Sequence, residues 1–385
     1  MHAPGLATIM REMSPVLLFL GLGRSHEMRL YRSFQFRALA FRGVLGPLLG
    51  GAFGIALGIM NYGLSALVIQ HITTAAISLI MVWTSSSWRP VFAIERASAI
   101  EVMKFIWLSA PATIVNLASL NCDTFLVAYF FGIDNAGVYT VAKRLKLALQ
   151  TVVTSPFNGV LLSVLAEIQD DAQRLRDGSR KMIALILFVS VPIFVGASLI
   201  SKEMILLFFG ERWLAVAPIF ATLALGGVFV TPQSFCDTLF SLKNRQMWSF
   251  YYLLIYTALA ILLFFALQAS TPEYLALPFV LPYVAAFPFS AILASKLIDF
   301  SLSDWLRAAA PSAISAGAMF AVARLMNLGS LAKGDVWGML AFCVIGGLVY
   351  LVAMFVLDRM TVLAAVESFR HLLHRDLSQH ARESR

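Results

Sequence analysis

Two stripes of polar side chains run at helical spacing through otherwise apolar sequence between residues 101 and 165. Asn116, Ser119 and Asp123 are separated by three and four residues, so they share one face of a helix. The second stripe, at the same spacing and with Arg144 beside it, contains Lys143, Lys146, Gln150, Thr154 and Asn158. A charge at bilayer depth costs about 2.5 to 3.5 kcal/mol on insertion scales, so such groups face water, a partner or a substrate. The stripes predict a hydrated, cationic cavity that an anionic, lipid-linked substrate can enter.

The elements that must position these stripes are two long apolar helices joined by a short turn at residues 132–135. The whole chain has the same apolar character: 59% of its 385 residues are hydrophobic and 13% are charged. Its mean hydropathy is +0.81. A soluble protein carries about 25% charged residues, so the composition predicts an all-α polytopic membrane protein.

Ten apolar segments are long enough to span a bilayer, each containing about 20 residues or more. They are 39–60, 63–83, 103–131, 136–164, 181–201, 214–241, 247–268, 275–295, 305–325 and 336–357. Before them, residues 15–22 are too short to span, and we interpret them as the end of a further spanning helix. The expected loops include 24–38 and 166–181.

Loop charge predicts the orientation. One set of alternate connections, which includes 24–42 and the tail 359–385, contains 21 Lys and Arg residues, whereas the other contains four. By the positive-inside rule the first set is cytoplasmic, and so is the C-terminus. The net charge of +8 therefore reflects membrane topology and does not indicate nucleic-acid binding.

Several classes of function lack support in the sequence. The cysteines, Cys122, Cys236 and Cys343, each lie alone in an apolar segment, a spacing typical of neither a zinc site nor a disulfide framework. No connection is long enough for a soluble catalytic domain. We expect no metal, no cofactor and no catalytic residue.

Motifs along the chain, taken in order, resemble the Wzx-type polysaccharide flippases of the multidrug/oligosaccharidyl-lipid/polysaccharide exporter superfamily. Residues 136–144 are similar to that family's Gly-x-Tyr-x-x-Ala pattern followed by a basic residue. The most distinctive match is the Phe-Gly-x-x-Trp turn at 209–213. The resemblance covers about residues 25 to 240, and the last four helices match by hydropathy only.

The resemblance implies a two-lobed fold of twelve to fourteen helices, of which the first three and most of a fourth are missing here. We expect either a reading frame that starts too late or a shortened paralogue, and we favour the former. The implied division is a remainder of the first lobe (1–100), a second lobe (101–298), an extra helix pair (299–358) and a cytoplasmic tail (359–385).

The implied function is the flipping of an oligosaccharide linked to a lipid diphosphate across the bacterial inner membrane. Lys143, Arg144 and Lys146 would then bind the diphosphate, where Arg offers a two-pronged fork and Lys a point charge. Sugar hydroxyls would be bound by the polar lining residues Asn116, Gln150, Thr154 and Asn158. Asp123 would balance the cations or carry a coupling ion.

Each of these assignments has a structural alternative. Lys143 and Lys146 can extend to the membrane surface, and the polar residues can join neighbouring helices by hydrogen bonds. At the level of function, the alternatives are a multidrug exporter of the same superfamily, an integral-membrane polymerase or ligase, and a non-transporting scaffold of polysaccharide assembly. Polymerase and export machinery are the expected protein partners.

Overall fold

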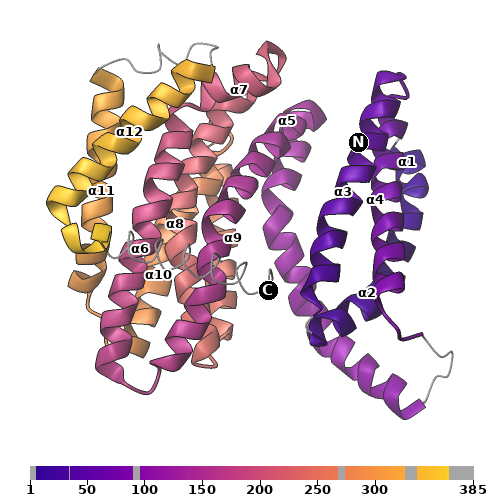
Figure 1. Cartoon of the computed structure of the whole chain (residues 1–385), viewed down its shortest axis with the longest axis horizontal. Helices are drawn as coiled ribbons and strands as arrows, with labels where there is room; N and C mark the ends of the chain where they lie inside the picture. The colour runs from indigo at the N-terminus through magenta and orange to yellow at the C-terminus, as the bar shows by residue number, and fades with distance from the viewer. Residues whose placement is uncertain (1–5, 34, 90–95, 268–273, 326–335, 364–385) are drawn as a thin grey trace, which may run out of the picture. The chain divides into compact units, whose positions relative to one another are not determined.

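The computed structural model describes residues 6–33, 35–89, 96–267, 274–325 and 336–363, and every regular element in these ranges is a helix (Figure 1). The chain forms two compact units, residues 1–104 and 105–385, which are described separately below. The finer division of the second unit into a lobe and an extra helix pair stays a prediction.

The first unit consists of α1 (Leu6–Glu12), α2 (Ser14–Arg32), α3 (Phe36–Ile59), α4 (Leu64–Ser85) and the beginning of α5 (Arg96–Glu167). The turn between α3 and α4 uses two residues with positive φ, Asn61 at 62° and Gly63 at 57°. It folds the two helices into a tightly packed hairpin.

A row of glycines on α3 explains how closely this hairpin packs. Gly46, Gly50 and Gly54 recur every four residues and face α4. A Cβ atom at Gly50 would lie 2.9 Å from the backbone oxygen of Gln70. Small residues at this spacing allow helices in a membrane to approach backbone to backbone.

Helix α5 bends back on itself at Gly132, whose backbone is not helical (φ 86°, ψ 170°). Positive φ is accessible to glycine because it has no Cβ atom. The side chain of Tyr139 reaches Asp123 across the bend, so the two halves of α5 form an antiparallel hairpin. The predicted turn between the two stripes is therefore confirmed.

The second unit continues after α5 with helices that bury an extensive apolar core. They are α6 (Ala172–Leu199), α7 (Ser201–Phe209), η1 (Glu211–Trp213), α8 (Val216–Leu242), α9 (Met247–Leu267), α10 (Leu277–Ile298), α11 (Leu302–Leu325) and α12 (Val336–Leu357). Helix α8 packs against α6 and α10, while α11 packs against α6 and α12 (Figure 1). Gly210, with φ 79°, ends α7 and begins the single turn η1, which is the distinctive turn expected at 209–213.

The predicted spanning segments agree with the structure. Nine helices in the described ranges are long and apolar enough to cross a membrane. One of them, residues 113–157, is the α5 hairpin and accounts for two of the ten predicted segments.

Two predicted loops are wrong in part. Residues 24–32 belong to α2, because Glu27 accepts hydrogen bonds from Arg24 and Arg42 at 2.9 Å each and so offsets their charge. Helix α6 begins at Ala172, because the side chain of Asp171 accepts hydrogen bonds from the backbone N–H groups of Gln173 and Arg174. Both helices thus carry charged residues that sequence patterning had placed in connections.

Candidate functional site

An ion pair joins the two halves of the α5 hairpin. Lys143 Nζ donates a hydrogen bond to Asp123 Oδ1 at 2.7 Å, and the two side chains are only 20% and 14% exposed. Tyr139 Oη donates to the other carboxylate oxygen at 2.9 Å. Lys143 also reaches the backbone oxygen of Leu120 at 2.8 Å. Every charge in this cluster therefore has a partner of opposite charge or a polar contact.

Lys146 lies one turn further along α5 and is buried. Its Nζ donates to Gln150 Oε1 at 2.7 Å and lies 5.4 Å from the centre of the Tyr283 ring of α10. The Tyr256 ring of α9 lies 4.5 Å from Tyr283, and Tyr256 Oη donates to the backbone oxygen of Phe279 at 2.9 Å. Lys146 is thus held inside the bundle by an amide and the face of an aromatic ring.

The spacing of the sequence explains this grouping. Tyr139, Lys143, Lys146 and Gln150 follow one another at steps of four, three and four, so they lie on one face of the second half of α5. Tyr139 and Ala142 are fully buried, which brings this face against the first half of α5 and against α10. The polar stripe is therefore the inner face of the helix.

The other predicted site residues have different positions. Arg144 is exposed, and within the described part of the chain it has no hydrogen-bond or ionic partner. Asn116 is exposed two turns before Asp123. Thr154 Oγ1 donates to the backbone oxygen of Gln150, within its own helix. The side chain of Asn158 lies outside the described residues, so its predicted role stays a prediction.

Sequence reasoning missed the tyrosines. Tyr139 was part of a motif without a role of its own, although its place four residues before Lys143 puts it on the stripe. Tyr256 and Tyr283 come from helices more than 100 residues away in the sequence, and no local spacing could have found them.

Sequence reasoning also missed a second intramembrane carboxylate, Asp237 on α8. It accepts hydrogen bonds from Ser249 at 2.6 Å and from Gln233 at 3.1 Å, and within the described residues it has no cationic partner.

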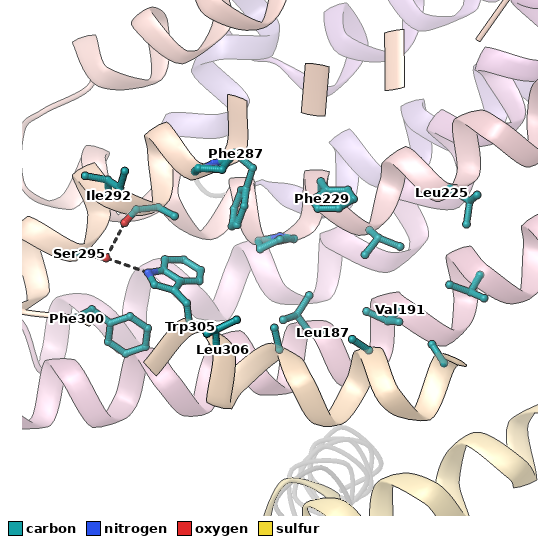
Figure 2. A pocket seen from close by; sticks show the side chains of 18 of the residues that line it. Leu187, Val191, Leu225, Phe229, Phe287, Ile292, Ser295, Phe300, Trp305 and Leu306 are labelled. Atoms are coloured by element: carbon teal, nitrogen blue, oxygen red, sulfur yellow. Dashed lines mark hydrogen bonds between the residues drawn. The ribbon is translucent and has the colours of Figure 1, made fainter. Parts of the chain in front are cut away.

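The second unit also contains an apolar pocket of about 1140 Å³ between α6, α8, α10 and α11. Figure 2 shows Leu187, Leu225 and Phe229 among the side chains that line it. At one end Trp305 Nε1 donates to Ser295 Oγ at 3.0 Å, and the charged residues among the described lining are Lys296 and Asp299. The pocket can hold a hydrocarbon chain with a polar group at that end.

Comparisons with known proteins identify the family and the fold of this chain. Residues 1–218 match the model of a family described as polysaccharide biosynthesis protein. In structure, the chain is similar to the lipid II flippase MurJ in its inward closed conformation, with a TM-score of 0.74, 17% identity, and 92% of this chain and 75% of MurJ covered. At that identity the likeness shows the fold.

Three relatives have names that refer to teichuronic acid, succinoglycan or lipopolysaccharide biosynthesis. The teichuronic acid biosynthesis protein TuaB of Bacillus subtilis is 23% identical over 78% of this chain, and the succinoglycan biosynthesis transport protein ExoT of Rhizobium meliloti is 24% identical over 60%. The lipopolysaccharide biosynthesis protein WzxC of Escherichia coli is 27% identical over 42%. The chain spans 63%, 47% and 33% of their respective lengths. Because the family model matches more than half of the sequence, this chain belongs to the polysaccharide biosynthesis protein family of membrane proteins.

Proposed function

We propose that the protein moves an oligosaccharide linked to a lipid diphosphate across the bacterial inner membrane by alternating access, without making or breaking a covalent bond. The observation that carries this proposal is the polar cluster of Asp123, Tyr139, Lys143 and Lys146, held at membrane depth in a bundle with the fold of a lipid flippase. Intramembrane charges that pair with one another commonly mark a substrate or ion pathway.

Arg144 is the first contact that we propose for the diphosphate. Its guanidinium is exposed and has no partner among the described residues, so it can bind an anion without breaking an existing contact. Arg also matches two phosphate oxygens at once. Lys143 can join it only by leaving Asp123, which makes the ion pair a switch between an unloaded and a loaded state.

Lys146 has a supporting role in this proposal. It is 6% exposed and already bound by Gln150 and Tyr283, so in this conformation a substrate cannot reach it. The sugar hydroxyls are left to exposed polar groups such as Asn116, whereas Gln150 and Thr154 form hydrogen bonds within α5.

The apolar pocket of the second unit is the place that we propose for the lipid chain. Most of its described lining is apolar, and Lys296 and Asp299 make one end polar. We propose that this end and the C-terminus are cytoplasmic, as the loop charges predict. Polymerase and export machinery remain proposed partners.

A multidrug exporter is the rival within the superfamily. Cationic drugs require an acidic or aromatic cavity. Among the described residues on the two arms of the α5 hairpin, the exposed charge is that of Arg144, and the exposed carboxylate of Asp134 lies at the turn between the arms. A non-transporting scaffold would leave lipid-linked oligosaccharide unchanged after gene deletion.

The test begins with deletion of the gene and complementation by Arg144→Ala, with Arg180→Ala as a control that removes another exposed arginine. A charge-assisted hydrogen bond contributes about 1.5 to 3 kcal/mol, so R144A should slow flipping by about 10- to 150-fold. Lipid-linked units should accumulate and surface polymer should fall, while the amount of protein in the membrane is unchanged. Normal surface polysaccharide at normal protein level would remove Arg144 from the mechanism. Unchanged lipid-linked units after deletion, with any paralogue also removed, would refute flipping.

A further inference from the structure

The first unit has a polar pocket of about 410 Å³ where the end of α2 meets the segment that follows α4. Apart from Leu30, the described residues of its lining supply guanidinium, hydroxyl, amide and indole groups. They belong to Arg29, Arg32, Ser33, Gln35, Ser86, Ser87 and Trp88. Every described residue of its lining belongs to the first unit.

The pocket keeps an uncompensated positive charge. The nearby carboxylate, Glu27, is already bound by Arg24 and Arg42 at 2.9 Å each. Burial alone would raise the pKa of Glu27, but these hydrogen bonds outweigh burial and lower it, so Glu27 stays ionised and fully paired. Within the described residues, Arg29 and Arg32 have no carboxylate partner.

The walls of the pocket are held in place before any ligand arrives. The Arg29 guanidinium lies 5.0 Å from the centre of the Trp88 ring, a contact that orients it. Arg89 Nη1 donates to the backbone oxygens of Ser86 at 2.6 Å and of Trp88 at 2.9 Å. Those bonds fix the short segment that carries the Ser86 and Ser87 hydroxyls.

At the carbonyl end of α2, two backbone oxygens already accept hydrogen bonds, which reduces their repulsion of an anion. Ser33 donates to the oxygen of Arg29 from both N and Oγ, at 2.9 Å each. Gln35 N donates to the oxygen of Leu30 at 3.0 Å. The partial negative charge of the helix terminus instead favours the two arginines beside it.

We propose that this pocket binds a phosphate group, held by Arg29 and Arg32 and bounded by the Ser87 hydroxyl. Two guanidinium groups without a carboxylate partner, next to hydroxyl donors, match the charge and the geometry of phosphate oxygens. Basic pockets between transmembrane helices on the cytoplasmic side are known to bind the phosphate head groups of anionic lipids. The phosphate is that of an anionic phospholipid or is free in solution, and the experiment separates these two sources.

The experiment titrates the full chain, purified in a neutral detergent, with three probes and measures occupancy by native mass spectrometry. The probes are short-chain phosphatidylglycerol, phosphatidylcholine with the same chains, and inorganic phosphate. Each basic residue near anionic lipid contributes about fivefold in affinity, so R29Q/R32Q should weaken binding about 30-fold. R29K/R32K keeps both charges and should lose about fivefold or less, which separates charge from misfolding.

The matched control is R180Q/K181Q, which removes two exposed cations from the second unit. Its affinity should stay within twofold of the unaltered chain. Phosphatidylglycerol binding that inorganic phosphate does not displace identifies a lipid head group as the ligand, and phosphate binding with the same arginine dependence identifies a free anion. Equal losses in R29Q/R32Q and R180Q/K181Q, or equal binding of all three probes by every variant, would overturn the proposal.

Discussion

The ion pair between Asp123 and Lys143 allows a quantitative test of the site through Asp123→Asn, Lys143→Met and the double variant. Breaking a buried pair by removing one partner costs about 3 to 5 kcal/mol, whereas replacing both partners costs less than the two single changes together, because no unpaired charge is left buried. Lys143 is 20% exposed, so we expect about 3 kcal/mol of destabilisation for K143M, at the lower end of that range.

The two single variants should differ in how much they destabilise the folded protein. In K143M the Asp123 carboxylate keeps Tyr139 Oη and the N–H and hydroxyl groups of Thr124 as donors, all of them uncharged. In D123N the Lys143 ammonium keeps the backbone oxygen of Leu120, and the new amide oxygen can still accept from Tyr139. We therefore expect about 2 kcal/mol for D123N, within the range for loss of a hydrogen bond to a charged group.

The double variant D123N/K143M should be about 2 kcal/mol more stable than the sum of the single effects predicts. The measurement is denaturant unfolding of the full chain in detergent, followed by circular dichroism. As a control, K143M combined with Asp237→Asn joins two sites that share no contact, and its effects should add within about 0.5 kcal/mol. Additivity of D123N and K143M would show that the pair is not formed in the folded protein.

Three further predictions concern the packing of the α3–α4 hairpin, the rate of flipping and the pH dependence of stability. Gly50→Leu should destabilise the α3–α4 hairpin by about 1 to 3 kcal/mol in thermal unfolding, because its Cβ would meet the Gln70 backbone oxygen at 2.9 Å; Gly51→Leu, with open space at its Cβ, should have little effect. Gly317 lines the apolar pocket, and a Cβ atom there would have open space around it. The Gly317→Leu variant should therefore fold normally yet flip its substrate several-fold more slowly, whereas Gly347→Leu on α12 should leave flipping unchanged. His26 is buried against Trp83 and Trp88, and burial and then the charges of Arg89 and Arg29 lower its pKa below 6.5. Since the unfolded state then binds more protons, stability should be complete above pH 6.5 and fall as the pH drops toward the folded pKa, and His26→Phe should remove this slope in unfolding midpoints measured from pH 7.5 to 5.5.

Periodicity was sufficient to locate the α5 hairpin and its inner face. The steps of three and four from Lys143 to Gln150 put the side chains on one side of a helix whatever surrounds it. The turn at Gly132 could also be predicted, because a glycine between two polar stripes is where a chain can adopt positive φ.

Sequence could not predict how the three cations would differ in environment. Lys143, Arg144 and Lys146 are neighbours in sequence, yet one is paired, one is exposed and one is buried against Tyr283. Successive helical residues point about 100° apart, and what each meets is decided by helices distant in sequence. The charged end of α2 could not be predicted for the same reason, since Glu27 forms an ion pair with Arg42 of the next helix.

The bend at Gly132 has a consequence for the way in which the chain enters the membrane during synthesis. Asp123 and Lys143 are 20 residues apart in sequence and lie on opposite arms of one hairpin. Inserted one arm at a time, each charge would enter lipid alone, at about 2.5 to 3.5 kcal/mol. If both arms leave the translocation channel together, the two charges neutralise each other before either meets hydrocarbon. We therefore expect the two arms to insert as one unit, so that lengthening the turn should delay integration of both arms.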